Sequence, residues 1–175
     1  MAQRQTKKRA TQTAGTAKKL YTLEVFIISG PITKSFVKKN RVISRTIQIR
    51  GDQTLEELHC AIFDAFDRED EHMYEFQIGG EGPMDPKARR YVLHLSNHDL
   101  ESEGESEGDV KRTTIESLGL KVNDAFGYWF DFGDDWWHQI NVLVIEEKAV
   151  QGKFPKVIKR RGESPPQYVD WDEEE

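Results

Sequence analysis

The sequence is poor in the features that identify secreted and membrane proteins. Its single cysteine, Cys60, excludes an intramolecular disulfide and favours a reducing compartment. No apolar run approaches the length of a membrane span, and the longest begins near Val25 and stops at Ser29. The first residues also lack the apolar stretch of a secretory signal. These absences predict a cytoplasmic chain with no membrane partner.

Apolar residues are scarce as well, at 37% of the chain against 32% charged residues. The shortage lies at the two ends, so the middle has the composition of one ordinary domain. Residues 1–19 carry a charge of +6 without any acid, so the rest of the chain carries −12 within a total of −6. This asymmetry argues against a protein that coats nucleic acid with its whole surface. It leaves two interpretations of the basic arm, a DNA contact or simple solvation. The arm's cations are Arg4, Lys7, Lys8, Arg9, Lys18 and Lys19.

The middle of the chain shows the periodicities of strands and of one main helix. Thr54 and Glu57 form a capping box, and apolar residues recur at helical spacing through about residue 67. Residues 114–119 resemble one short helical turn ended by glycine. Alternation of apolar and polar residues predicts strands at residues 20–29, 43–49, 74–78 and 90–95.

We therefore predict an α+β domain at residues 20–162, with one main helix packed on a face of a mostly antiparallel sheet. The expected order is β-β-α-β-β-short α-β-β, and its start is analogous to a β-grasp fold. Residues 34–41 are expected to be a basic loop and residues 96–110 a flexible acidic loop. The ends are expected to be a disordered basic arm at residues 1–19 and an acidic tail at residues 163–175.

The densest chemistry lies in residues 128–140, which hold six aromatic residues, three aspartates and a histidine. Aromatic residues suit a pleated strand and Gly133–Asp135 is typical of a turn, so this block predicts an antiparallel hairpin. Trp136 and Trp137 are consecutive on a strand and must point to opposite faces. One should enter the core, and the other should be exposed or be covered by residues 153–166. The candidate surface for a protein partner comprises Asp131, Asp134, Asp135, Trp136, Trp137 and His138.

The same hairpin could contribute to a metal site. If the helix carrying His59 packs on the hairpin's sheet, imidazoles and carboxylates could converge in a set that suits Zn or Mn. The opposing interpretation is structural, with the histidines at helix and strand ends and the aspartates bonding the backbone of the turn. The candidate ligands are His59, His72, Asp131, Asp134 and His138.

No catalytic motif stands in the sequence context that it requires. A Gly-x-Ser-x-Gly pattern occurs only at residues 104–108, inside the acidic run that we expect to be a loop, and the glycine-rich run at residues 79–82 is followed by Pro83 rather than by the Lys-Ser/Thr of a phosphate loop. Cys60 follows His59 directly on a helix, where adjacent side chains do not face each other. The sequence therefore favours a binding module without a cofactor over an enzyme.

Three segments carry a family resemblance, at residues 54–59, 71–76 and 128–140. Together they resemble the plasmid Orf-three-like family first named from an Ri plasmid, over roughly residues 21–168. Some of its members carry the TnpR-like name of an insertion-element passenger protein. The resemblance implies an α+β fold, an association with mobile elements and no settled activity. The family usually ends in a run that this chain keeps only in part, because Gln167 and the residues after it replace the expected acid and glycines.

These observations combine into two hypotheses. The first is a non-enzymatic accessory protein linked to mobile elements, which contacts a protein partner through the hairpin surface and DNA through the basic arm. The alternative is a metal-dependent hydrolase or nuclease that uses the aspartates and histidines of the hairpin.

Overall fold

The computed structural model describes residues 18–93 and 107–171. The strands are β1 (Leu20–Ser29), β2 (Ser44–Arg50), β3 (Tyr74–Ile78), β4 (Arg89–Val92), β5 (Gly108–Asp109), β6 (Ala125–Phe130), β7 (Trp136–Glu146) and β8 (Lys156–Arg161). The helices are α1 (Lys34–Lys39), α2 (Leu55–Ala65) and the short 3-10 helix η2 (Glu116–Leu118).

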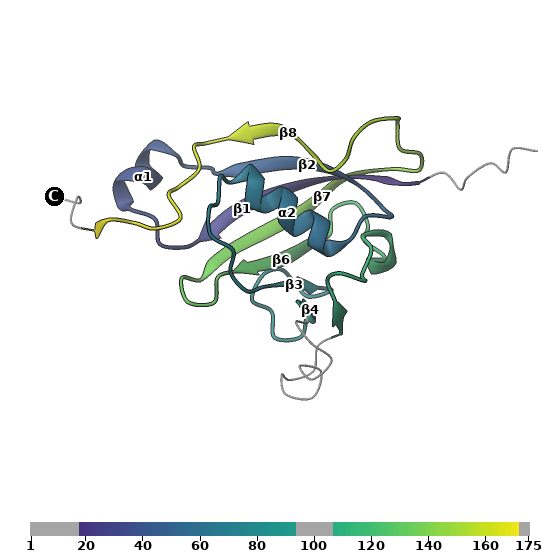
Figure 1. The fold of residues 1–175 in the computed structure, drawn as a ribbon, viewed down its shortest axis with the longest axis horizontal. Coiled ribbons are helices and arrows are strands. Elements are labelled where there is room, and N and C mark those ends of the chain that lie inside the picture. The colour runs from purple at the N-terminus through teal and green to yellow at the C-terminus, as the bar shows by residue number, and fades with distance from the viewer. Residues whose placement is uncertain (1–17, 94–106, 172–175) are drawn as a thin grey trace, which may run out of the picture.

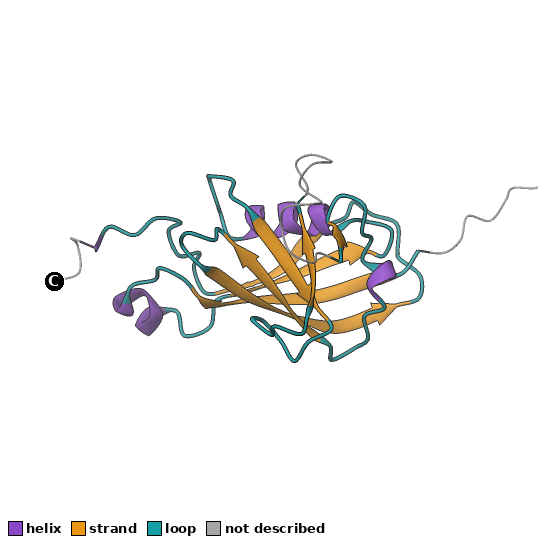
Figure 2. Ribbon diagram, turned by 90° about the horizontal axis from the view of Figure 1, so that it is seen from below, coloured by secondary structure: helices purple, strands orange, loops and turns teal. Residues whose placement is uncertain are grey.

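All eight strands belong to one sheet, in the order β5-β4-β3-β6-β7-β1-β2-β8. Neighbouring strands are antiparallel except for β4 and β5, which are parallel. Helix α2 lies across one face of this sheet (Figure 1, Figure 2), which we call the inner face. The predicted α+β class fits broadly, since the described residues form a mixed sheet with few helices. β1 is flanked by antiparallel β2 and β7, and the β-grasp analogy stays a prediction.

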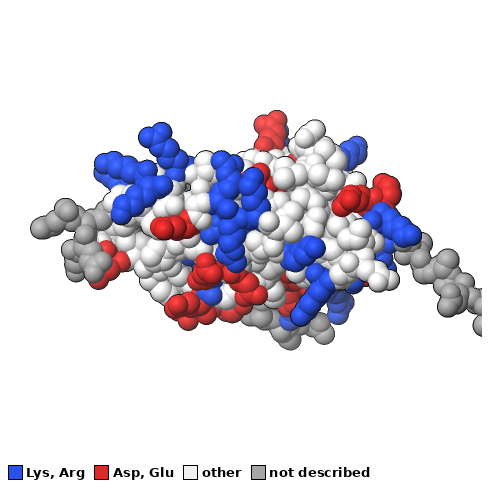
Figure 3. All heavy atoms as spheres, turned by 90° about the horizontal axis from the view of Figure 1, so that it is seen from above, with Lys and Arg blue, Asp and Glu red and all other residues white. Residues whose placement is uncertain are grey.

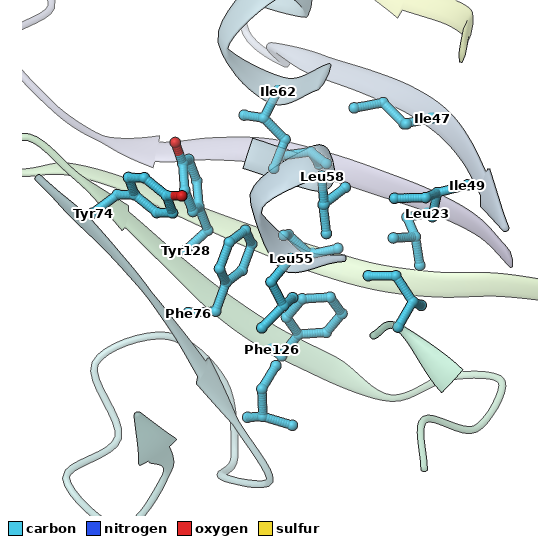
Figure 4. Packing of buried hydrophobic residues seen from close by; sticks show 14 of the residues in the cluster. Leu23, Ile47, Ile49, Leu55, Leu58, Ile62, Tyr74, Phe76, Phe126 and Tyr128 are labelled. Atoms are coloured by element: carbon cyan, nitrogen blue, oxygen red, sulfur yellow. The ribbon is translucent and has the colours of Figure 1, made fainter. Parts of the chain in front are cut away.

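The core lies between α2 and the inner face. Leu55, Leu58 and Ile62 recur on one side of α2 and are buried against residues from β1 and β2 (Figure 4). The predicted capping box is present, because the Thr54 hydroxyl accepts from the Glu57 N–H at 3.2 Å and the Glu57 carboxylate accepts from the Thr54 N–H at 2.7 Å. The start and packed face of this helix are thus fixed by local sequence.

Three elements differ from the sequence-based expectation. The predicted basic loop contains α1, whose first turn is capped by the Thr33 hydroxyl accepting from the Phe36 N–H at 3.2 Å. The predicted acidic loop contains β5, which pairs with β4, while residues 94–106 of that loop lie outside the described residues. The basic run after residue 153 contains β8, which pairs with β2. Each is too short or too rich in charge for periodicity to mark it.

Packing continues beyond the predicted domain end at residue 162. Pro165 and Gln167 are buried, and the Gln167 side-chain oxygen accepts from the backbone N–H groups of Glu69 and Asp70 at 2.8 and 3.0 Å. The Arg45 guanidinium, itself buried, donates to the Ser164 hydroxyl at 2.8 Å. Residues 164–167 of the predicted tail are therefore part of the folded body. Among the helices in the described ranges, none has the length and apolar character needed to cross a membrane.

Candidate functional site

The hairpin predicted from the aromatic block joins β6 to β7 through residues 131–135, a longer turn than the predicted Gly133–Asp135. Asp131 and Asp135 adopt positive φ angles of 57° and 54°. One Asp131 carboxylate oxygen accepts from the N–H groups of Gly133 at 3.1 Å and Asp134 at 3.3 Å. Asp131 is buried, so it shapes the turn and does not belong to the predicted contact surface.

Trp136 lies on the inner face and is fully buried. The Arg68 guanidinium stacks over its ring at 3.9 Å from the ring centroid. Gly30 lies so close that an added Cβ atom would be 2.4 Å from the ring carbon Cε3. The prediction that Trp136 forms part of the contact surface is therefore wrong, because strand alternation points this side chain into the core.

His138 is the second residue of the predicted surface that the structure places inside. It is 1% exposed, and its Nδ1 atom lies 3.3 Å from the Tyr128 carbonyl oxygen. Burial, followed by the nearby charge of Arg68, lowers the pKa of His138 to about 3. The imidazole is thus a neutral core side chain at physiological pH.

The opposite, outer face of the hairpin carries an aromatic cluster that the sequence only partly revealed. The rings of Trp129 and Trp137 stack with centroids 4.7 Å apart and planes 6° from parallel. Phe132 packs on Trp129 with the ring centroids 4.2 Å apart, and it remains 39% exposed. The Trp129 indole N–H donates to the Asp135 carboxylate at 2.9 Å. We call Trp129, Phe132, Asp134, Asp135 and Trp137 the outer hairpin patch.

Trp129 and Phe132 are the functional candidates that sequence reasoning missed. The signal was the turn length, since five residues between the strands make Trp129 the direct partner of Trp137. Direct partners on an antiparallel pair share one face and can touch. Asp134 and Asp135 are exposed at the tip beside this stack.

His59 sits at the centre of a separate buried network. Its Nδ1 atom lies 2.7 Å from the Tyr128 hydroxyl, and its Nε2 atom lies 3.1 Å from the Glu71 carboxylate. Burial lowers the pKa of His59 and raises the pKa of Tyr128, so both side chains are neutral. Because a carboxylate only accepts, His59 donates from Nε2 to Glu71 and accepts from the Tyr128 hydroxyl at Nδ1. The ring also stacks on Tyr74 at 3.6 Å.

This network borders a pocket of about 560 Å³ lined in part by Cys60, Glu71, His72 and Tyr74. Both nitrogens of His59 are engaged, so the imidazole keeps no lone pair for accepting a substrate proton. Burial, together with neighbouring carboxylates, raises the pKa of Cys60, which keeps the thiol protonated and weakly nucleophilic. The geometry therefore indicates a structural role, in which the hydrogen bond between His59 and Tyr128 joins α2 to β6.

The predicted metal ligands are dispersed among these settings. His72 and Asp131 come together, with Nε2 3.4 Å from the carboxylate, and His72 also contacts the Tyr168 hydroxyl at 3.0 Å. His59 and His138 have the separate partners given above. Within residues 18–93 and 107–171, no group of three or more histidine, cysteine or acidic side chains is placed to hold a metal ion.

Only the root of the basic arm is described. Lys18 pairs with Asp52 at 2.8 Å, and Lys19 lies 3.7 Å from Glu116. These two lysines fasten the start of β1 to the acidic body. Arg4, Lys7, Lys8 and Arg9 lie outside the described residues.

Comparison with known proteins places this architecture in a family. The chain is similar in fold to the crystal structure of the protein of unknown function MM3350 from Methanosarcina mazei Go1, with a TM-score of 0.61 and 23% identity over 83% of this chain and 71% of that chain. No curated protein matches the sequence. A family model described as plasmid pRiA4b ORF-3-like protein matches residues 35–171, which is most of the chain. The protein therefore belongs to the plasmid pRiA4b ORF-3-like family.

Proposed function

We propose that the protein is a non-enzymatic accessory module of mobile elements that binds a protein partner through the outer hairpin patch. The observation that carries this proposal is the parallel stack of Trp129 and Trp137 on the outer face of the sheet. Both rings are half-buried, and Phe132 beside them is exposed. Tryptophan is enriched among the residues that dominate binding energy at protein interfaces.

The charge around the patch selects the kind of partner. Asp134 and Asp135 are exposed beside the stacked rings, and no basic side chain belongs to the patch. Lysine and arginine are attracted both to carboxylates and to the faces of tryptophan rings. The partner that fits is a protein segment with a lysine or arginine flanked by apolar residues.

Site-specific photocrosslinking in cells that naturally express the chain tests this proposal. A photoreactive phenylalanine analogue at position 132 should yield a discrete protein adduct. The same analogue at position 150 is the control, because Val150 is also exposed, at 63%, and lies outside the patch. The adduct should disappear when Trp129→Ser and Trp137→Ser are introduced together. Equal adducts at positions 132 and 150 would refute a role for the patch.

Binding of DNA through the basic arm is a second part of the proposal. It is supported by the charge of +6 in residues 1–19, since cationic arms bind phosphate by releasing counterions. Removing residues 1–19 should abolish salt-sensitive binding of duplex DNA. Unchanged duplex binding would rule out a role for the arm.

The metal-dependent hydrolase alternative has less support. Its remaining basis is the contact between His72 and Asp131, which supplies two candidate ligands. Catalytic zinc sites commonly use three protein ligands and an open position. Metal analysis of the purified chain beside a His72→Ala/Asp131→Ala variant distinguishes the two hypotheses. Stoichiometric Zn or Mn that is lost in a folded variant would favour the enzyme.

A further inference from the structure

A second part of the outer face, further along β7 from the tip of the hairpin, combines polar rows with a basic edge. Strand pairing places Phe26 between Gln139 of β7 and Ser44 of β2, and Ser44 faces Arg161 of β8. Directly paired residues share one face of a sheet, so these side chains form a row across four strands. The next row along the sheet contains Asn141, Glu24, Thr46 and Lys159.

The basic edge extends from β8 to α1. The Glu163 N–H donates to the Asn40 side chain at 2.9 Å, which ties the end of β8 to the end of α1. Figure 3 shows Lys and Arg side chains gathered on the left and in the centre of this view, where α1 and β8 lie in Figure 1. The basic edge comprises seven of the exposed cations of the two elements and their flanks: Lys38, Lys39, Arg41, Lys156, Lys159, Arg160 and Arg161.

Little of this charge is neutralised within the described part of the chain. Arg160 lies 3.8 Å from Asp67, and Arg161 lies 4.0 Å from Glu24. The other cations of the edge have no carboxylate within ion-pair distance among the residues that the structure describes. The edge is therefore a concentrated positive surface on a chain whose net charge is −6.

A pocket of about 460 Å³ opens beside this edge. Its walls include Phe26, Val37 of α1, the cation Arg41 and the amides of Gln139 and Asn141. The Gln139 amide N–H donates to the Asn141 side-chain oxygen at 2.9 Å, which orients the two amides as a pair. An amide pair offers both donors and acceptors to a ligand.

We propose that the Phe26 pocket and the basic edge bind single-stranded nucleic acid. A base would enter the pocket against Phe26 and the amide pair, while phosphates would follow Arg41, Arg161 and Lys159. Aromatic side chains next to a cationic track are the arrangement by which proteins bind single strands, whose unpaired bases are free to stack. A duplex keeps its bases stacked inside and would leave the pocket unused.

Protection of the edge strand is the simpler explanation for lysine and arginine on β8, because charge there prevents pairing with other strands. It accounts for the cations of β8 alone. It does not account for the cations at α1, for the pocket between them, or for the oriented amide pair. Single-strand binding accounts for all of these features together.

Fluorescence anisotropy with the full chain tests the proposal. The probes are a labelled 15-nucleotide single strand of DNA and of RNA, the corresponding DNA duplex and a labelled polyglutamate peptide. The edge variant is Arg41→Gln/Lys159→Gln/Arg161→Gln. Its matched control is Lys111→Gln/Arg112→Gln/Lys121→Gln, which removes the same charge from exposed loops elsewhere. A third variant neutralises the arm through Arg4→Gln/Lys7→Gln/Lys8→Gln/Arg9→Gln.

We expect the wild type to bind a single strand more tightly than the duplex or polyglutamate, with affinity that falls as salt rises. The edge variant should bind at least about 10-fold more weakly and the loop control should bind normally, as counterion release predicts for three lost contacts. Phe26→Leu, which keeps the side chain apolar, should weaken binding about 5- to 100-fold if a base stacks on the ring.

Four outcomes would overturn the proposal. These are no single-strand binding at low salt, equal or tighter binding of the duplex, equal binding of polyglutamate, and equal losses in the edge and loop variants. A fifth overturning outcome is loss of binding only in the arm variant, which would assign the contact to the arm. Thermal unfolding of each variant confirms that it is folded, and the Phe26→Leu result stands separately if the edge variant is unstable. None of these outcomes bears on crosslinking at position 132.

Discussion

Trp136 and Trp137 are neighbours in β7 with the same side chain, yet they have different surroundings. Trp136 is 0% exposed and lies between Gly30 and the Arg68 guanidinium. Trp137 lies on the other face, stacked on Trp129 and partly open to solvent. The inner position is enclosed in the core by Gly30 and Arg68, whereas the outer position stacks on its cross-strand partner Trp129. The comparison teaches that the two faces of the aromatic block differ in burial: the inner face belongs to the core, and the outer face carries the patch that we propose as a contact surface.

The test with the largest expected effect on stability replaces one tryptophan at a time. Trp136→Ala should lower the free energy of unfolding by about 3–5 kcal/mol, because it opens a cavity in a packed core. Trp137→Ala should cost less, because its half-buried ring loses a stacked pair worth about 0.5–1.5 kcal/mol beyond the area that it buries. Urea unfolding followed by circular dichroism measures both. Similar losses for the two variants would contradict the separation of the faces.

A second test concerns the polar part of the inner face. Tyr128→Phe removes the hydroxyl that bonds His59 and leaves a buried ring nitrogen without its partner, at a cost of about 1–3 kcal/mol. Tyr74→Phe is the matched control, because the Tyr74 hydroxyl is buried and has no hydrogen-bond partner in the described part of the chain. Chemical unfolding of both variants should show a clear loss for the first and little for the second. Equal losses of unfolding free energy would mean that the hydrogen bond between Tyr128 and His59 contributes no stability of its own.

A third test uses pH to detect the buried imidazoles. The pKa of His138 is about 3 in the folded protein and near 6.5 in the unfolded chain, so between these values the unfolded state binds the extra proton. Stability should therefore be constant above about pH 7 and should decrease as pH falls below 6.5, by about 1.4 kcal/mol per pH unit for this group. Unfolding free energies at pH 7, 6 and 5 should give a smaller slope for His138→Gln than for the wild type. An unchanged slope would mean that a group other than His138 takes up the proton on unfolding.

Much of the fold was predictable because its signals are local. The capping box at Thr54, the helical spacing of Leu55, Leu58 and Ile62, and the alternation in β3 each depend on residues close together in sequence. The hairpin followed from aromatic residues around a Gly-Asp-Asp turn. Neither β8 nor the burial of Arg45 was predictable, because both depend on segments more than 100 residues apart, as in the contact of Arg45 with Ser164.

The candidate site was only half predictable for the same reason. Consecutive positions in a strand require Trp136 and Trp137 to face opposite ways, but they do not say which one is inside. That choice came from the turn at Asp131, whose carboxylate bonds set the register in which Trp129 meets Trp137. A register shift of one residue would exchange the two faces.

By itself, the sequence determined the class of fold, the main helix, the hairpin and a basic arm on an acidic body. Each of these depends on composition or on a period of two or 3.6 residues, which short segments contain in full. Tertiary structure alone decided that His138 is a neutral core residue and that His59 joins α2 to β6 by a hydrogen bond. It also decided that β8 and α1 form one cationic edge. These features depend on burial and on contacts between distant segments, and the free energy of both is defined only once the chain has folded.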